Sequence, residues 1–191
     1  SVPAGEAAAI LKHYQSDASV KNVELDHSRK IASAASDPSY GDQWALPQIG
    51  WNNVHGSVNP SGSATIAVLD TGVDASVADL SGELVPGYSA FTGGDPTSDP
   101  NGHGTEVASI AAAATDNDSG IAGVAYSGVS IMPVQVIGAD GTGQDSDIIS
   151  GITYAADNGA DVIVLAFSNP SYSSLLQNAI TYAWSKGAVV V

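Results

Sequence analysis

The chain has 191 residues, enough for one compact domain with its own core, and it contains no cysteine, which excludes disulfides, thiolate zinc sites and cysteine nucleophiles. Only 13% of the residues are charged and the net charge is −15, so nucleic acid and anionic membranes are not expected as partners, whereas divalent cations would be attracted. No run approaches the roughly 18 consecutive apolar residues of a membrane-spanning helix.

The first thirty-odd residues predict a small unit that is distinct from the rest. Residues 7–14 have the apolar spacing of a short helix, and residues 20–27 alternate apolar and polar side chains as a half-buried strand does. Residues 33–42 are rich in Ser, Ala, Asp, Pro and Gly, which is typical of a linker. We therefore expect a small α+β unit over residues 1–32 and the main domain over residues 33–191.

Strands and helices alternate in the main domain, and its strands are apolar on both faces. This pattern is typical of an α/β fold in which a parallel sheet, with helices on both faces, forms a three-layer sandwich. The last strand runs to the final residue, so we expect a continuation or a second chain to complete the sheet. The predicted strands cover 64–69, 129–137, 162–167 and 188–191, and the predicted helices cover 105–114, 146–158 and 173–185.

Two short segments carry the candidate chemistry. Asp70 follows the apolar run 66–69, and the active crevice of an open parallel sheet lies at this end of its strands. His103 lies between two glycines at the start of a predicted helix, where the positive end of the helix dipole disfavours the protonated ring. A carboxylate and an imidazole are two of the three groups of a Ser-His-Asp catalytic system. Taken singly, each has an ordinary structural interpretation: Asp70 as a cap of the following turn, and His103 as a structural histidine whose hydrogen bonds are satisfied.

Taken together, the segments Asp70-Thr-Gly-Val and Asn101-Gly-His-Gly-Thr resemble the aspartate and histidine motifs of the subtilisin-like serine peptidases. Residues 120–125, 151–157 and 182–191 are similar to the thermitase-like branch of this family, and the resemblance runs from about residue 37 to residue 191. It implies a subtilisin-like fold, with Asp70 orienting His103 and His103 acting as the general base.

The resemblance implies a serine endopeptidase, but the oxyanion asparagine and the nucleophilic serine of the family lie downstream of the stretch that ends at Val191. The chain by itself is therefore predicted to be inactive, because no acyl-enzyme forms without a nucleophile. The alternative is a non-catalytic relative that binds a peptide or a partner protein through the same groove.

In this family a substrate peptide lies between two backbone edges. The first edge corresponds to Gly141, Thr142 and Gly143, and the second to Ala166, Phe167 and Ser168. The second edge departs from the family's Ser-Leu-Gly-Gly, and Ser168 restricts the backbone where the family has glycine. Phe167 could shape a specificity pocket or belong to the core, and the sequence leaves both open.

Two further departures lie close to His103. Glu106 replaces a family histidine and Ser109 replaces a glycine. Glu106 lies three positions after His103 on the predicted helix, so its carboxylate is expected to raise the pKa of the imidazole. This change would make His103 less available as a base near neutral pH.

The resemblance also implies a structural calcium ion, a propeptide and secretion. Residues 20–26 are similar to the last strand of a subtilase propeptide, and the segment between Arg29 and Ser36 corresponds to its inhibitory, cleaved tail, although a simple linker remains an alternative. The chain's own propeptide is thus a possible partner, and the protein is expected outside the cell, although no signal peptide is present. The implied calcium ligands, which are side-chain and main-chain oxygens suited to a hard ion, are Asp37, Asp79, Ala114, Asn117, Ser119 and Ile121.

Two other enzyme classes receive less support from the sequence. A metal hydrolase could use Asp70, His103 and Glu106 as ligands, but one histidine with this spacing is not a recognised zinc arrangement. The Gly141-x-Gly143 pair lacks the third glycine and the acidic residue of a dinucleotide-binding fingerprint.

Overall fold

A computed structural model describes residues 5–23, 34–168 and 171–191. The chain divides into two compact units, Ser1–Ile31 and Ala32–Val191. The described part of the first unit contains the helix α1 (Ala7–Gln15), close to the prediction, and no residue of this helix is buried. Residues 20–23 of the predicted strand 20–27 are described and are not part of a strand, whereas its residues 24–27, the predicted domain boundary at residues 32 and 33, and most of the predicted cleaved tail lie outside the described residues.

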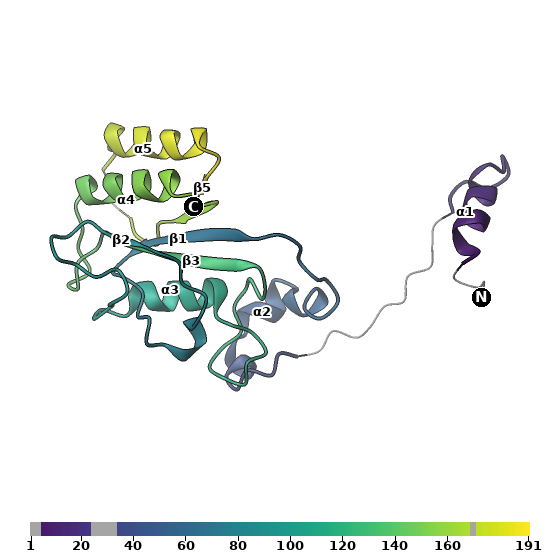
Figure 1. Cartoon of the computed structure of the whole chain (residues 1–191), viewed down its shortest axis with the longest axis horizontal. Coiled ribbons are helices and arrows are strands. Elements are labelled where there is room, and N and C mark those ends of the chain that lie inside the picture. Colours follow the sequence, from purple (N-terminus) through teal and green to yellow (C-terminus); the bar gives the residue numbers. More distant parts are fainter. Residues whose placement is uncertain (1–4, 24–33, 169–170) are drawn as a thin grey trace. The chain divides into compact units, whose positions relative to one another are not determined.

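The second unit is built on a five-stranded parallel sheet with the strand order β2-β3-β1-β4-β5 (Figure 1). The central strand β1 pairs with β3 on one side and with β4 on the other. The connection from β1 leads to β2 on one side, whereas the connection from β3 crosses to β4 on the other side, so the crevice at the carboxyl ends of β1 and β3 is the expected place for a site. The strands are β1 (Ala64–Asp70), β2 (Tyr88–Ser89), β3 (Val129–Gln135), β4 (Val162–Val164) and β5 (Val189–Val190).

Helices cover both faces of this sheet (Figure 1). Successive residues of a strand point to opposite faces: Ala67 and Leu69 pack into a core formed with α4 (Asp145–Asp157) and α5 (Ser174–Ser185), whereas Val68 packs into a second core with α3 (His103–Ala112). The predicted three-layer arrangement of the main domain is therefore present. The apolar-on-both-faces character of β1 follows from this double burial.

The segment that was expected to be a linker packs in part onto the domain. Asp37 is only 3% exposed, and a short 3₁₀ helix follows at Tyr40–Asp42. The α-helix α2 (Ala45–Gln48) and a 3₁₀ helix at Trp51–Asn53 bury Leu46 and Trp51 in a third small cluster. Composition alone predicts a linker here, but contacts with a loop some 80 residues later hold the segment in place, beginning with the hydrogen bond from Ser36 N–H to Asp116 Oδ1.

Among the predicted boundaries that are wrong, two lie beside the site. The strand β4 ends at Val164, not at residue 167, because its pairing with β1 stops at the pair Val68 and Val164 and the chain then turns to line a cleft. The helix α3 begins at His103, two residues earlier than predicted, after Gly102 with a φ of 96°. The third 3₁₀ helix, Ala78–Leu80, was not predicted, and neither were the other two.

In the part of the chain that the structure describes, no helix is long and apolar enough to cross a membrane.

Candidate active site

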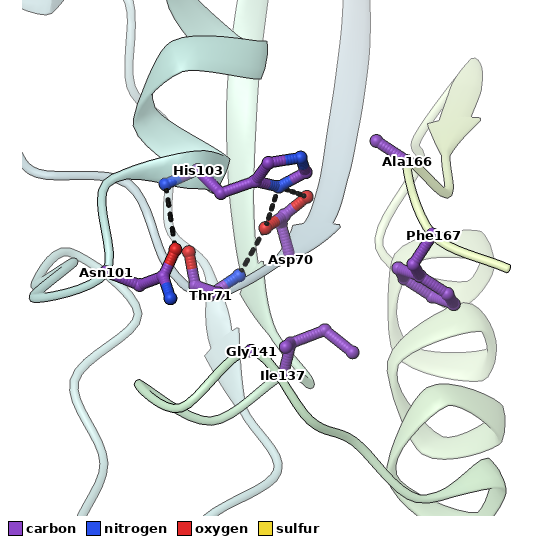
Figure 2. Close-up of a pocket in the computed structure, with 8 residues that line it drawn as sticks. All are labelled: Asp70, Thr71, Asn101, His103, Ile137, Gly141, Ala166 and Phe167. Atoms are coloured by element: carbon purple, nitrogen blue, oxygen red, sulfur yellow. Dashed lines mark hydrogen bonds and ion pairs between the residues drawn. The ribbon is translucent and has the colours of Figure 1, made fainter.

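A cleft of about 230 Å³ opens at the carboxyl end of β1, where Asp70 ends the strand and α3 begins. In Figure 2 the pair formed by Asp70 and His103 lies on one side of the cleft, and Ala166 and Phe167 lie on the other. The lining therefore comes from segments that are distant in sequence, as expected for a site at the switch point of a parallel sheet. The lining residues are Asp70, Thr71, Asn101, His103, Ile137, Gly141, Ala166 and Phe167.

The acid and the imidazole are in direct contact. Nδ1 of His103 lies 2.8 Å from Oδ1 and 2.9 Å from Oδ2 of Asp70. The Asp70 side chain is 2% exposed, whereas the His103 side chain is 49% exposed. The backbone N–H of Thr71 donates to Oδ1 of the same carboxylate at 2.7 Å, which fixes the orientation of the acid.

This contact determines how the ring presents its second nitrogen. A carboxylate accepts hydrogen bonds and does not donate them, so the proton of the imidazole lies on Nδ1. Nε2 then carries a lone pair in the neutral ring, and within the described residues it has no hydrogen-bond partner. A base with its proton held on the buried side and its lone pair in an open cleft is able to accept a proton from a bound group.

The electrostatic surroundings favour the protonated ring. The hydrogen bond to Asp70 raises the pKa of His103 above its ordinary value, and the charge of Asp70 adds to this effect, while burial lowers it. Glu106 and Asp99 raise the same pKa by smaller amounts. The direction of this shift is therefore opposite to the one expected from the helix dipole.

The first predicted substrate edge lies on a tight turn beside the cleft. The N–H of Gly138 donates to the carbonyl of Thr142 at 2.8 Å, and Gly141 adopts a φ of 80°. A Cβ added to Gly143 would lie 2.5 Å from Cδ1 of Ile137 and 2.8 Å from the carbonyl oxygen of Val136, so no side chain fits there. The turn is exposed and has a close-packed inner side.

The second predicted edge lies across the cleft from the first. Ala166 and Ser168 are exposed, and Phe167 is half-buried against the core cluster of the α4 and α5 face. The Phe167 side chain also lines both the cleft and a neighbouring cavity of about 340 Å³, whose lining includes Asp145, Ile148 and Leu176. The ring of Phe167 thus packs on the core and also lines two hollows, and its role in substrate specificity stays a prediction.

The predicted calcium ligands gather around one loop. Asp79 is 5% exposed, and its carboxylate accepts hydrogen bonds from Asn117 Nδ2 at 3.0 Å and from the N–H of Ile121 at 2.7 Å. Asp37 accepts from the N–H of Asp116 through Oδ2, but its buried Oδ1 has no partner. The residues predicted to offer main-chain oxygens to the ion belong to the same loop, residues 114–121, and are Ala114, Ser119 and Ile121.

These residues fit a hard cation, with one adjustment. A buried carboxylate oxygen without a partner, such as Oδ1 of Asp37, is costly unless an ion or a water satisfies it. Asn117 donates its amide N–H to Asp79 and accepts the N–H of Ser119 through Oδ1 at 2.8 Å, so turning its amide to offer oxygen on the Asp79 side would give up both bonds. In the described residues no group of three or more His, Cys, Asp or Glu side chains is placed to hold a metal, so Asp70, His103 and Glu106 do not form such a group, and the calcium site would depend on two carboxylates together with amide and main-chain oxygens.

Several functional neighbours of His103 were not singled out from the sequence. Thr71 and Asn101 line the cleft, and Asp99 bonds to the first turn of α3. Asp99 lies four positions before His103, in a segment whose sequence predicts a turn. Its hydrogen bond with Thr71, 28 positions away, cannot be predicted from such local sequence. An acid shortly before a helix is only a weak indication of capping.

The comparisons with known proteins agree with this architecture. The Subtilase family (Peptidase S8) model matches residues 61–191. A thermophilic serine proteinase of Bacillus sp. is 38% identical over 98% of this chain and 47% of its own length, and thermitase of Thermoactinomyces vulgaris is 42% identical over 82% of this chain and 54% of its own. An extracellular protease of Xanthomonas campestris is 31% identical over 97% of this chain and 39% of its own.

A solved structure is similar as well. The crystal structure of a cold adapted subtilisin-like serine proteinase superposes with a TM-score of 0.55 at 28% identity, over 68% of this chain and 45% of that one. The chain spans about half the length of the curated relatives it matches. With the family model covering more than half of the chain, and with the strand order and helix layers described above, the chain belongs to the subtilase family of serine peptidases.

Proposed function

We propose that the whole protein is a serine endopeptidase in which Asp70 orients and His103 acts as the general base. The observation that carries this proposal is the contact of His103 Nδ1 with both carboxylate oxygens of Asp70, at 2.8 and 2.9 Å, beside an open cleft. Membership of the subtilase family, whose relatives are serine peptidases, supports the same activity.

The chemistry follows from this contact. Nε2 of His103 takes the proton of a serine hydroxyl as that oxygen attacks the peptide carbonyl, and the ring becomes an imidazolium. The buried carboxylate of Asp70 stabilises the imidazolium through the Nδ1 hydrogen bond without taking its proton. The ring then returns the proton to the leaving amine. The proposal thus requires a serine whose hydroxyl reaches Nε2, and the relatives are long enough to hold further residues beyond the matched part.

A peptide or protein is the proposed substrate, bound as an extended strand between the two edges. The turn Gly141–Thr142–Gly143 is exposed and close to His103, which suits pairing of its backbone with a substrate strand. Ala166, Phe167 and Ser168 form the opposite edge. A side chain of the substrate could enter the hollow of about 340 Å³ beside Phe167, whose lining combines aliphatic residues such as Ile148 and Leu176 with glycines and polar residues such as Asp145.

Calcium is the proposed structural cofactor, held by Asp37 and Asp79 with the amide oxygen of Asn117 and main-chain oxygens of the loop 114–121. The unpartnered, buried Oδ1 of Asp37 supports this assignment. The ion would neutralise two buried carboxylates. It would also strengthen the link between the segment around Asp37 and the loop 114–121, which hydrogen bonds of Ser36 and Asp37 to Asp116 already join.

We further propose that residues 1–32 are the last part of an inhibitory propeptide and that the protein is secreted, as the name of the Xanthomonas campestris relative suggests for that protein.

A fluorophosphonate probe tests the activity, because it labels only a serine that is activated by a base. We expect labelling of the full gene product, strong loss of labelling in His103→Ala, and a loss of about 10⁴-fold in turnover in Asp70→Asn, where the histidine adopts the wrong tautomer. The 191-residue chain serves as the comparison and should remain unlabelled. If the full gene product is not labelled but still binds peptides in the groove, the protein is a non-catalytic relative and the proposal is wrong.

A further inference from the structure

A third carboxylate, Asp99, connects the two elements that carry the acid and the base. Its Oδ1 accepts the hydroxyl of Thr71 at 2.7 Å and the N–H of Gly102 at 2.9 Å. Its Oδ2 accepts the N–H of Thr105 at 2.9 Å and the hydroxyl of the same residue at 2.6 Å. One side chain therefore receives four hydrogen bonds, from the end of β1 and from the first turn of α3.

These bonds cap the N-terminus of α3, whose own N-cap residue offers no side chain. Gly102 is the N-cap residue of α3 and has no side chain with which to accept the free N–H groups of the first turn. Asp99 accepts from Thr105, and the hydroxyl of Thr71 accepts from the N–H of Gly104 at 3.1 Å. The helix that begins with His103 is thus capped by residues of a neighbouring loop and of the strand end.

The same bonds close a ring around the catalytic pair. Thr71 donates its backbone N–H to Asp70 Oδ1 and its hydroxyl to Asp99. Asp99 in turn holds the residues on either side of His103, namely Gly102 and Thr105. A shift of α3 relative to β1 would break several of these bonds at once, so the distance between Nδ1 and the Asp70 carboxylate is fixed from both sides.

We propose that Asp99 is a positioning residue that sets the contact between Asp70 and His103 by locking the start of α3 onto the end of β1. The role assigned to the pair rests on the proposed peptidase function, but the positioning itself does not. Although partial burial acts in the opposite direction, hydrogen bonds from Thr105, Thr71 and Gly102 lower the pKa of Asp99 below its ordinary value, so the acceptor is ionised over the neutral range. Its charge also adds a small upward contribution to the pKa of His103.

The test compares three variants of the full chain by NMR. In Asp99→Asn one acceptor oxygen becomes an NH₂ donor, which cannot accept from Thr105 N–H. Thr71→Val removes the hydroxyl link and changes no charge. Asp95→Asn is the matched control, because Asp95 lies in the same loop, carries the same charge and uses its carboxylate to accept the N–H and the hydroxyl of Thr97 rather than groups of α3 or β1. The readouts are the downfield Nδ1 proton signal of His103 and the pKa of its ring.

We expect both Asp99→Asn and Thr71→Val to broaden or abolish the Nδ1 proton signal and to lower the pKa of His103 toward its ordinary value, since a looser contact with Asp70 weakens the main cause of its upward shift. Asp95→Asn should leave the signal in place. In the active full-length protein, Asp99→Asn should lower kcat on the order of 10- to 100-fold with KM nearly unchanged, as expected for a misplaced catalytic group.

Two outcomes would overturn the proposal. One is a sharp Nδ1 signal and an unchanged pKa of His103 in Asp99→Asn despite a lower Tm, which would show that Asp99 stabilises the fold without positioning the pair. The other is a fall in pKa in Asp99→Asn but none in Thr71→Val, which would reduce its effect to charge alone. If the NMR result holds while the wild-type protein cleaves no peptide, the peptidase function is wrong and the positioning role of Asp99 stands.

Discussion

Gly104 and Asp70 lie so close that no side chain fits between them. A Cβ placed on Gly104 would lie 2.9 Å from Cβ of Asp70 and 2.2 Å from the carbonyl oxygen of Gly72. The helix that presents His103 therefore packs directly on the backbone that presents Asp70. This close packing, together with the bonds of Asp99, makes the meeting of acid and base a property of two elements and not only of two side chains.

Gly104→Ala should disturb this packing. The new methyl group meets a backbone oxygen that cannot move without displacing the strand end, so we expect a loss of roughly 1–3 kcal/mol in the free energy of unfolding and a weaker Nδ1 contact with Asp70. Gly41→Ala is the control, because a Cβ there meets nothing within 4 Å and no positive φ opposes it. Denaturant unfolding measures both, and equal stabilities of the two variants would contradict the prediction.

Glu106→Gln should lower the pKa of His103. The charge of Glu106 is one of the causes that raise this pKa, but it ranks below the hydrogen bond and the charge of Asp70. We therefore expect a smaller fall in Glu106→Gln than in Asp70→Asn, measured by NMR titration of the ring. Glu106→His, which introduces the residue that the family has at this position, should act in the same direction. An unchanged titration would mean that the two groups do not interact.

The pH dependence of stability follows from the raised pKa of His103. Because its pKa is higher in the folded state than in the unfolded state, the ring contributes stability below its unfolded pKa and loses that contribution as the pH rises through the folded pKa. The ring is half exposed, so solvent screening keeps the contribution modest. The difference in free energy of unfolding between wild type and His103→Ala, followed from about pH 5 to pH 9, should shrink with rising pH. A difference that grows instead would contradict the assignment.

Calcium should stabilise the protein if the site around Asp37 and Asp79 binds it. At 100 times its Kd a ligand of the folded state adds about 2.7 kcal/mol, which corresponds to a rise in Tm of several degrees for a domain of this size. Asp37→Asn and Asp79→Asn should abolish the rise, whereas Asp95→Asn should retain it. A Tm that is insensitive to both calcium and a chelator would show that the unpartnered oxygen of Asp37 has another explanation.

Much of the fold could be predicted from local sequence. The apolar runs of the predicted strands become four of the five strands, and the helical patterns become α3, α4 and α5 within two residues at each end. The fifth strand, β2, has only two residues, Tyr88–Ser89, too few for any pattern to be read. Strands and helices of this kind are determined by the periodicity of burial, which the residues themselves carry.

The sequence by itself determined the alternation of strands and helices, the position of Asp70 at a strand end and of His103 at a helix start, and the resemblance to a peptidase family. Only the tertiary structure decided which hydrogen bonds join the segment around Asp37 to the loop 114–121, that β4 ends at Val164, and that Asp99 bonds to Thr71 as well as to the start of α3. The physical reason is the sequence separation over which each kind of interaction acts. Periodicity and turn chemistry act over a few residues, whereas these contacts join groups 28 to 96 positions apart and form only when the sheet brings them together.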